Sequence, residues 1–482
     1  MRERLPPSLG ELARDTIVAL ATPPGTGAIA VVRLSGPHAL RIAYQIFRPV
    51  SGSPPPHSRS SRRRSMRYGR ITDPKCGTMV DQGLLLTMPG PKSFTGEDVA
   101  ELHCHGGELL VNRVLEICIG LGARPAARGE FTRRAYLNGR IDLTQAEAVA
   151  SLVRAETEQG LRLAARQLEG GLGQELCGLL RRLSGVAAAV EATIDFPDDE
   201  SEMPDGEWIR SELAAVNGAL ELLLATADSG RRMAEGVNIV IVGRPNVGKS
   251  SIFNRLLGRR RAIVDEHPGT TRDVVEARLD LGGVPVRLMD TAGLRESDER
   301  VERRGMAMTE GAIDTGDLLL LVVEAGPLPG PDDRRALAGV GGALPCLVVV
   351  NKTDVEPAPM DADEVRGALG LEPGTPLVAV SALTGAGFTE LESDLAGLTG
   401  GPALLARDAA VLTTARQERA IRAGVAGLEK ARTAYEAAMP AEVWLVGTYL
   451  AMDSLAQAIG RRSDEVREQV LEEVFARFCV GK

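Results

Sequence analysis

No apolar run in this 482-residue sequence approaches the ~18 residues that a membrane-spanning helix needs. The first residues, Met1–Pro7, lack the apolar core of a secretory signal peptide. The six cysteines are scattered and show no C-x-x-C pair, so neither a zinc ribbon nor a disulfide framework is supported. We therefore expect a soluble, cytoplasmic protein that makes no contact with a membrane.

The sequence also lacks an excess of positive charge. Its net charge of −9 means that any contact with nucleic acid must come from a local basic patch. One candidate is the segment 51–70, which is rich in Pro, Ser and Arg and is predicted to be a mobile loop. Two interpretations remain open for this segment: a solvated surface insert, or RNA phosphate contacts through Arg59, Arg62, Arg63, Arg64, Arg67 and Arg70.

Length and periodicity indicate several domains. A hydrophobic fraction of 44% is ample for packed cores, and 482 residues predict about three domains. Short β-like runs and a helix over Glu108–Gly120 indicate an N-terminal α+β unit. Two helical segments flank a compact α/β unit, so we expect them to pack together around an insertion. The predicted boundaries are 1–140, 141–235, 236–399 and 400–482.

The most informative segment is Gly243–Ser250 (GRPNVGKS), which follows an apolar run and precedes a helix-like stretch. A glycine loop between a strand and a helix turns backbone N–H groups onto phosphate oxygens. We expect Lys249 to reach the β- and γ-phosphates and Ser250 to bind Mg²⁺. The predicted nucleotide contacts here are Asn246, Val247, Gly248, Lys249, Ser250 and Ser251.

Two downstream segments have the pattern of γ-phosphate sensors. Pro268–Asp273 (PGTTRD) offers two hydroxyl groups, and we expect Thr271 to complete the Mg²⁺ shell. Asp290–Gly293 (DTAG) ends a predicted hairpin over 278–289. An aspartate there suits a contact with Mg²⁺-bound water, and a glycine three residues later suits a γ-phosphate-sensing amide. The predicted contacts are Asp290, Thr291, Ala292 and Gly293.

Two more segments predict the base. The segment Asn351–Asp354 (NKTD) ends a predicted buried strand, Leu347–Val350. A carboxylate at Asp354 can accept hydrogen bonds from the ring N–H and the amino group of guanine, whereas adenine offers no such donor pair. A second predicted strand, Leu377–Val380, leads to a loop whose backbone could meet the 6-oxo group. GTP is therefore the predicted nucleotide, with contacts from Asn351, Lys352, Asp354, Ser381 and Ala382.

The glutamine that orients the attacking water in many small GTPases is missing. Leu294 occupies its position directly after Gly293 and cannot orient water. Asn246 is a candidate for holding a monovalent cation that neutralises charge in the transition state. Glu302 could position water through a bridge, although an exposed helix acid without a catalytic role is the commoner case for such a residue.

Further segments carry a resemblance to a known family. They are Asp15–Gly25, Ser93–Val99, His103–Gly107, Gly129–Ala135, Asn138–Glu147, Asp195–Asp198 and Cys479–Lys482. With the GTPase motifs, they make nearly the whole chain resemble the tRNA-modification GTPase family called MnmE or TrmE. The resemblance implies a multidomain fold: an α+β N-terminal folate-binding-like domain that also dimerises, a discontinuous α-helical domain, and an inserted α/β Ras-like P-loop GTPase domain.

The resemblance also implies an activity and its partners. Members of this family are homodimers whose GTP hydrolysis is stimulated by K⁺ and by dimerisation of the G domains. They act with an FAD-containing partner of the MnmG (GidA) family. The pair installs an aminomethyl-type group at carbon 5 of the wobble uridine of certain tRNAs. The implied cofactors are Mg²⁺, K⁺ and a tetrahydrofolate one-carbon donor, either the 5-formyl or the methylene derivative.

Residue roles follow from the resemblance position by position. Folate contacts would be Arg33, Glu101, Arg140 and Lys482, and Arg140 stands where some members have lysine, which alters the geometry. The K⁺ site would use Asn246 and the loop that contains Asp265, His267 and Thr270. Asp265 and His267 depart from the family's residue types, which backbone ligation should tolerate.

Two residues would be catalytic by the same resemblance. Glu302 falls where the family's water-positioning glutamate lies, which favours a catalytic role over the exposed helix acid. Cys479 would act near the folate and uridine chemistry as a nucleophile or positioning group, or would simply be a packed terminal cysteine.

Two alternatives are weighed against this interpretation. His103, Cys104 and His105 look like a metal cluster, but adjacent residues in a strand point to opposite faces, so we expect no metal there. A K⁺-dependent ribosome-assembly GTPase that only binds RNA would share Leu294 and the Asn246-type loop. Such proteins normally carry an RNA-binding appendage such as a KH domain, and no G-x-x-G loop occurs here in a suitable context.

Replacing Glu302 with alanine tests the water-positioning role. We expect Glu302→Ala to keep its affinity for GTP and to lose most of its turnover, because only the attacking water loses its partner. The measurement is kcat in KCl, with the Kd of a GTP analogue as the control. Equal turnover of the wild type and the variant would refute the role.

Overall fold

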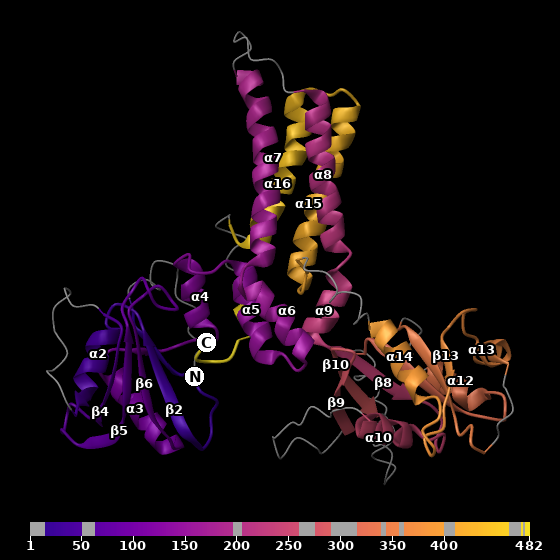
Figure 1. Cartoon of the computed structure of the whole chain (residues 1–482), viewed down its shortest axis with the longest axis horizontal. Helices are drawn as coiled ribbons and strands as arrows, with labels where there is room; N and C mark the ends of the chain where they lie inside the picture. The colour runs from indigo at the N-terminus through magenta and orange to yellow at the C-terminus, as the bar shows by residue number, and fades with distance from the viewer. Residues whose placement is uncertain are drawn as a thin grey trace. The chain divides into compact units, whose positions relative to one another are not determined.

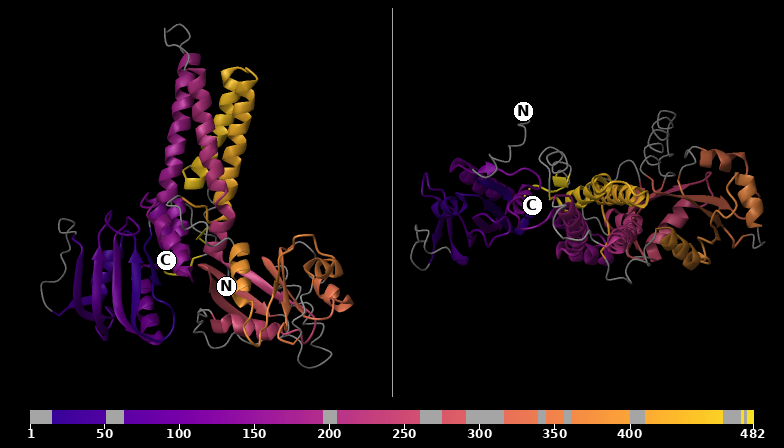
Figure 2. Two further views of the ribbon diagram at one scale, coloured as in Figure 1. Left: turned by 45° about the vertical axis from the view of Figure 1, so that its right-hand side comes forward. Right: turned by 90° about the horizontal axis from the view of Figure 1, so that it is seen from above.

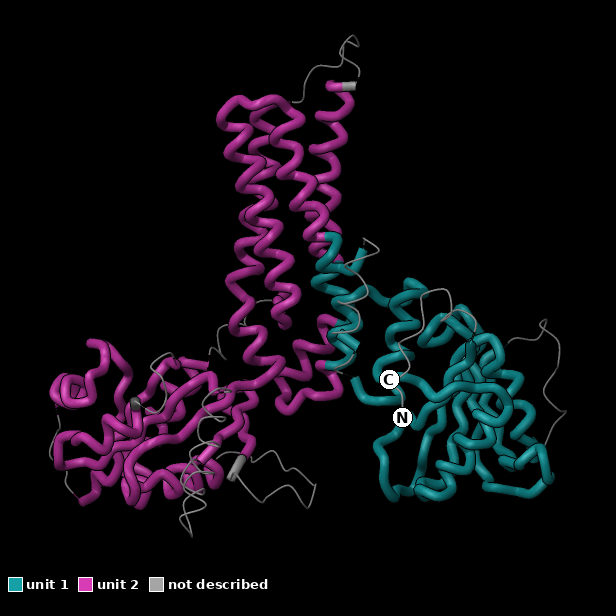
Figure 3. The backbone as a smooth tube through the Cα atoms, turned by 180° about the vertical axis from the view of Figure 1, so that it is seen from behind, with its two compact units in different colours: residues 1–150, 168–173, 456–482 teal, residues 151–167, 174–455 magenta. Residues whose placement is uncertain are grey.

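A computed structural model describes residues 15–50, 63–195, 205–259, 275–290, 316–338, 344–355, 361–399, 410–461, 474–475 and 478–482. The chain divides into two compact units (Figure 3). Unit 1 comprises residues 1–150, 168–173 and 456–482, and unit 2 comprises residues 151–167 and 174–455. Each unit buries its own apolar core.

Unit 1 is built on a sheet that is seven-stranded in its described residues, in the order β3-β4-β5-β6-β2-β1-β7. Alternate side chains point to one face, where Val32, Leu34 and Leu102 pack with apolar residues of α2 and α3. The elements are β1 (Ile17–Leu20), β2 (Gly27–Ser35), α2 (Ala39–Ile46), β3 (Phe47–Pro49), β4 (Ser65–Thr72), β5 (Met79–Met88), β6 (Val99–Gly106), α3 (Glu108–Gly120), β7 (Arg124–Pro125), α4 (Glu130–Leu137) and α5 (Leu143–Arg154), whose last turn belongs to unit 2.

The structure confirms the predicted helix over Glu108–Gly120 and corrects the predicted loop over 51–70. Residues 51–62 lie outside the described part of the chain, but Ser65–Thr72 forms β4, paired antiparallel with β5. Composition alone suggested a loop, whereas the hydrogen bonds that β5 offers make the segment a strand. Arg67 and Arg70 are therefore strand residues, and Gly69 and Ile71 between and beside them are buried.

The helices of unit 2 include a bundle in which α7, α8, α15 and α16 lie side by side (Figures 1 and 2). α8 precedes the α/β region in sequence and α15 follows it, and the two pack together, which confirms the predicted discontinuous helical domain. The helices outside the α/β region are α6 (Glu158–Leu168), α7 (Gly171–Asp195), α8 (Gly206–Leu224), α9 (Ala227–Glu235), α15 (Ala415–Glu436) and α16 (Ala441–Ile459).

The α/β region of unit 2 contains a sheet in the order β13-β12-β11-β8-β10-β9, six-stranded over the described residues. All neighbours are parallel except the edge strand β9. The central strands β8, β11 and β12 contribute side chains to a core on each face, so they are largely apolar runs. The carboxyl ends of the parallel strands meet at one edge. The elements are β8 (Val237–Val242), α10 (Lys249–Arg259), β9 (Val275–Leu281), β10 (Val284–Asp290), β11 (Leu318–Glu324), α12 (Pro331–Ala338), β12 (Cys346–Asn351), α13 (Ala362–Leu369), β13 (Leu377–Ala379) and α14 (Phe388–Thr399).

Among the helices of the described ranges, none combines the length and the apolar character that crossing a membrane requires.

Glycines allow α15 and α16 to approach closely, which generates a test of the bundle. A Cβ on Gly447 would lie 2.6 Å from the backbone N of Ala431 and 2.7 Å from the carbonyl O of Gly427. On α8, a Cβ on Gly218 would meet no atom within 4 Å. We expect Gly447→Ala to destabilise the bundle by about 1–3 kcal/mol through overpacking. Gly218→Ala should stabilise it by up to about 1 kcal/mol through helix propensity.

The measurement is thermal unfolding of the full chain, followed by circular dichroism at a helix wavelength. The two variants make the same chemical change in two helices, so they differ chiefly in the room for a methyl group. A rise in Tm for Gly447→Ala like that of Gly218→Ala would contradict the close packing of α15 on α16.

Candidate functional site

The glycine loop Gly243–Ser250 leaves β8 at the carboxyl edge of the sheet and leads into α10, which begins at Lys249. Gly248 has a φ of 97°, and a Cβ on it would lie 2.2 Å from Nδ2 of Asn351. Asn246 also has a left-handed backbone, with a φ of 64°, which asparagine tolerates better than most residues. Position 248 therefore needs glycine, because the side chain of Asn351 packs against the backbone there.

Two predicted phosphate-site residues lie at the start of α10. Nζ of Lys249 donates to the carbonyl oxygens of Gly243 and Arg244, both at 2.9 Å, so the amine folds over the loop. Oγ of Ser250 donates to Oδ2 of Asp290 at 2.9 Å. Asp290 is buried at the end of β10. The structure thus joins the predicted Mg²⁺ ligand to the aspartate predicted to contact Mg²⁺-bound water.

The buried side chain of Asn351 connects two loops. It is 1% exposed, and its Nδ2 donates to the carbonyl O of Val247 at 2.8 Å. Its Oδ1 accepts from the backbone N of Ala382 at 3.0 Å. One side-chain amide at the end of β12 therefore fixes the glycine loop relative to the predicted guanine loop.

Asp354 and Ser381, both predicted to contact guanine, lie together. Oγ of Ser381 donates to Oδ1 of Asp354 at 2.6 Å, so the carboxylate is held beside the loop that follows β13. Lys352, between Asn351 and Asp354, has a φ of 69° and turns the chain at the end of β12. Ser251 is exposed on the first turn of α10, whereas Val247 is buried and contributes through its backbone.

Glu324 was not predicted and connects two parts of this site. At the end of β11, it accepts from Nζ of Lys352 at 2.7 Å and from the guanidinium of Arg244 at 2.6 Å. The hydrogen bond from Lys352 lowers the pKa of Glu324 below its usual range. The sequence could have indicated Glu324, because it is the single acidic residue at the end of the apolar run Leu318–Val323. As the last residue of β11, it lies at the same edge of the sheet as the ends of β8 and β12.

Several predicted residues lie outside the described part of the chain. They are Thr271 for Mg²⁺, Asp265, His267 and Thr270 for K⁺, Thr291, Ala292 and Gly293 for the nucleotide, and Glu302 for the attacking water.

In unit 1, three of the predicted folate residues form a charged cluster. The guanidinium of Arg33 on β2 is 2.8 Å from Oε1 of Glu101 on β6. Burial, together with the positive charge of Arg33, lowers the pKa of the Lys482 amine. The stem of Arg140 packs against Gly96, since its Cγ would be 3.2 Å from a Cβ on that glycine.

A buried ion-pair network centred on Arg134 supports this unit. Arg134 is 1% exposed and pairs with Asp15 at 2.6 Å, Glu130 at 3.0 Å and Glu97 at 3.1 Å. Burial by itself would raise the pKa of Asp15. Hydrogen bonds from Arg124 and Arg134 outweigh this effect and hold the pKa of Asp15 below its usual range. The segments Asp15–Gly25, Ser93–Val99 and Gly129–Ala135 thus meet at one guanidinium, which sequence spacing could not reveal.

The cysteines differ sharply in environment. Burial raises the pKa of Cys104 to about 11 and that of Cys118 to about 12, so neither thiol is a nucleophile at neutral pH. Cys479 is exposed, which argues against a packed terminal cysteine. Its carbonyl O accepts from the backbone N of Gly129 at 3.4 Å, so the C-terminal segment is held against unit 1.

The histidines around Cys104 are not arranged for metal. His103 lies 3.4 Å from Glu101, and His105 lies 2.8 Å from Asp81. Within the described ranges, no group of three or more His, Cys, Asp or Glu side chains is placed to hold a metal ion.

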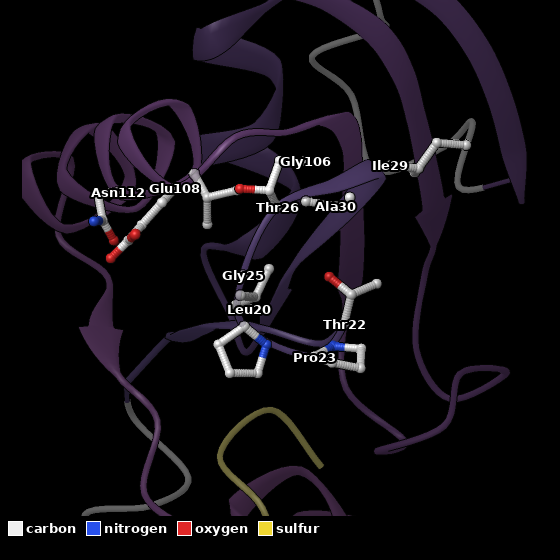
Figure 4. Close-up of a pocket in the computed structure, with 13 residues that line it drawn as sticks. Leu20, Thr22, Pro23, Gly25, Thr26, Ile29, Ala30, Gly106, Glu108 and Asn112 are labelled. Atoms are coloured by element: carbon white, nitrogen blue, oxygen red, sulfur yellow. The ribbon is translucent and has the colours of Figure 1, made fainter. Parts of the chain in front are cut away.

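A pocket of about 390 Å³ lies at one end of the unit 1 sheet (Figure 4). It is enclosed by the loop that follows β1, the end of β6 at Gly106 and the first turns of α3, where Glu108 and Asn112 lie. Its wall includes Leu20 and Thr22–Gly25, from the second half of the segment that begins at Asp15. Arg33, Glu101, Arg140 and Lys482 do not line it.

The double role of Asn351 generates a prediction. Asn351→Ala would leave the carbonyl O of Val247 and the backbone N of Ala382 without this partner, at a cost of about 1–3 kcal/mol for each group. We expect the affinity for GDP to fall at least about tenfold. The measurement is calorimetric titration with GDP, and Asn254→Ala, an exposed position on α10, is the control. Unchanged affinity in Asn351→Ala would refute the proposed connection.

Comparison with known proteins covers both units. Residues 16–140 match the family described as GTP-binding protein TrmE N-terminus, and residues 143–479 match the MnmE helical domain. The tRNA modification GTPase MnmE of Symbiobacterium thermophilum is 44% identical over 473 residues, which cover 98% of this chain and 100% of that protein. The MnmE of Moorella thermoacetica is 42% identical over 470 residues, or 97% of this chain and 99% of the relative.

Among solved structures, the G domain of the T. maritima FeoB iron transporter is similar to part of the chain. It is 25% identical, covers 34% of this chain and 98% of its own, and has a TM-score of 0.26. The family matches and the full-length relatives indicate a GTPase, as do the motifs and the geometry of the candidate nucleotide site. The chain belongs to the MnmE family of tRNA modification GTPases.

Proposed function

We propose that this chain is a GTP-hydrolysing enzyme of tRNA modification. The observation that carries the nucleotide part is the buried amide of Asn351, which joins the glycine loop to Ala382. Asp354, held by the hydroxyl of Ser381, is available to accept from the donor pair of guanine. Membership of the MnmE family carries the tRNA part.

The residues of the phosphate site fit a nucleotide with Mg²⁺. Ser250 and Asp290 present a hydroxyl and a carboxylate 2.9 Å apart, and such oxygen donors suit Mg²⁺. Lys249, now bonded to the carbonyls of its own loop, would exchange them for β- and γ-phosphate oxygens. When bound, Mg²⁺ would neutralise the charge of the phosphates, and Thr271 would complete its shell.

A monovalent cation would supply the charge that other GTPases take from an arginine finger. We assign Asn246 to this K⁺ site together with the loop residues Asp265, His267 and Thr270, and we assign Glu302 to the attacking water. The left-handed backbone of Asn246 supports the assignment, because it presents the asparagine at a tight turn in the loop. Equal turnover in KCl and NaCl at matched ionic strength would exclude K⁺ as the catalytic charge.

The reaction that we propose for the tRNA is modification of the wobble uridine. With an FAD-binding partner of the MnmG (GidA) type, the chain would install an aminomethyl-type group at carbon 5. The one-carbon unit would come from 5-formyl- or methylene-tetrahydrofolate. Exposed Cys479 lies near Lys482, at the end of the C-terminal segment, and is the side chain we assign to this chemistry.

The charged cluster of unit 1 fits a folate. Arg33 and Lys482 offer two cations to an anionic ligand, and Glu101 can accept hydrogen bonds from ring N–H groups like those of a pterin. Arg140, whose stem packs on Gly96, would join them from the side of the segment Ser93–Val99.

We propose a cytoplasmic homodimer that uses the open face of the unit 1 sheet. α2 and α3 cover the other face, whereas this one exposes apolar side chains. Register places Tyr68, Leu84, His103 and Val31 in one row across β4, β5, β6 and β2. Ile29, Met66 and Tyr68 on this face are 65%, 69% and 55% exposed, so a second copy that covered the face would bury apolar surface.

The alternative is a K⁺-dependent ribosome-assembly GTPase that only binds RNA. Mass spectrometry of tRNA nucleosides separates the two. In cells that lack this chain, we expect the modified wobble uridines to disappear. Expression of the wild type should restore them, whereas Asn351→Ala should restore them poorly because its nucleotide site is damaged. If the modified wobble uridines are still present in the deletion strain, the modification role is wrong and the alternative is favoured.

A further inference from the structure

An arginine on α10 supports the loop that follows β13. Nη1 of Arg255 donates to the carbonyl O of Ala382 at 2.7 Å and to that of Leu383 at 2.8 Å. Arg255 lies in the second turn of the helix that begins with Lys249 and Ser250. The helix that carries the phosphate residues therefore also contacts the backbone of the predicted guanine loop.

The guanidinium is itself held in place. Its Cζ lies 5.7 Å from the ring centroid of buried Phe388, a cation–π contact. On the loop side, Gly385 has a φ of 91°, and a Cβ on it would lie 2.4 Å from Nη2 of Arg255. The loop backbone thus passes directly against the guanidinium, and a side chain at that position would displace it.

The same loop is closed by its own hydrogen bonds. The backbone N of Ser381 donates to the carbonyl O of Ala386 at 3.0 Å, and that of Gly385 donates to the carbonyl O of Ser381 at 2.8 Å. The carbonyl groups of Ala382 and Leu383 receive Arg255 instead. Since each peptide group is planar, fixing the carbonyl of Ala382 also fixes the direction of the N–H group of Leu383. The N–H of Thr384 donates to Oγ of Ser381 at 3.0 Å, which closes the loop further.

We propose that Arg255 is a positioning residue for base selection, which orients the loop Ser381–Thr384 toward the 6-oxo edge of guanine. The inference rests on the proposed function, because it assumes that guanine lies against this loop. Asp354 is carried by the segment after β12 and would accept from the 2-amino edge. Arg255 should therefore affect recognition of one edge of the base and leave the other unchanged.

Two nucleotide analogues test recognition of the two edges of guanine separately. In 6-thioguanosine diphosphate, sulfur replaces the 6-oxo oxygen and both donors to Asp354 remain. Inosine diphosphate keeps the 6-oxo group and lacks the 2-amino group. We expect the wild type to prefer GDP to the thio analogue by about tenfold or more, because a fixed loop rejects a larger, weaker acceptor. In Arg255→Met this preference should fall to within about threefold, while the preference for GDP over inosine diphosphate is unchanged.

Two further variants complete the experiment, which measures Kd by calorimetric titration of the full chain. Arg255→Lys retains one cationic donor and should restore part of the preference over the thio analogue. Arg259→Met is the matched control: Arg259 lies one turn later on α10 and contacts Glu392 at 3.0 Å and Thr389 at 3.3 Å, both on α14. It should behave as the wild type.

Each outcome decides between the proposals. If Arg255→Met keeps the wild-type preference, or weakens binding of all three nucleotides by the same factor, the positioning role is wrong and Arg255 is only structural. If the wild type itself does not prefer GDP to inosine diphosphate, Asp354 does not recognise guanine. The proposed nucleotide specificity is then wrong, whatever the result for Arg255.

Discussion

The nucleotide site depends on one buried amide. Asn351 is almost fully enclosed, so each of its polar atoms needs a partner, and the partners come from two other loops. The close approach is possible only because Gly248 has no side chain. Moving the glycine loop, the end of β12 or the loop after β13 would break a hydrogen bond in a place that water cannot reach. The loops proposed to bind the phosphates and the base therefore share a common support.

Unit 1 solves a similar problem with charge. The guanidinium of Arg134 is buried among the carboxylates of Asp15, Glu97 and Glu130, and the cost of removing these charges from water is met by their mutual pairing. The segments that make the sequence resemble its family meet around this group. Part of the resemblance therefore reflects the support of the fold.

The sequence predicted elements well wherever periodicity or an apolar run was strong. α3 has the predicted bounds, the apolar run before Gly243 is the strand β8, and the two helical segments on either side of the α/β region pack together. The predicted loop over 51–70 was wrong for residues 65–70, which belong to β4, because a composition rich in Arg and Ser does not reveal a neighbouring strand that offers hydrogen bonds. Glu324 and Arg255 were missed because their partners lie tens of residues away in the chain.

The predicted chemistry came from the sequence alone: a phosphate loop, a carboxylate suited to guanine, a missing glutamine at Leu294 and a family resemblance over nearly the whole length. Such motifs are local, since the backbone geometry they need is contained in a few consecutive residues. The tertiary structure decided which groups meet. Only folding brings Asn351 under Gly248, Arg255 against the loop after β13, and Asp15 onto Arg134. These contacts depend on how strands and helices pack, and packing is not encoded by spacing along the chain.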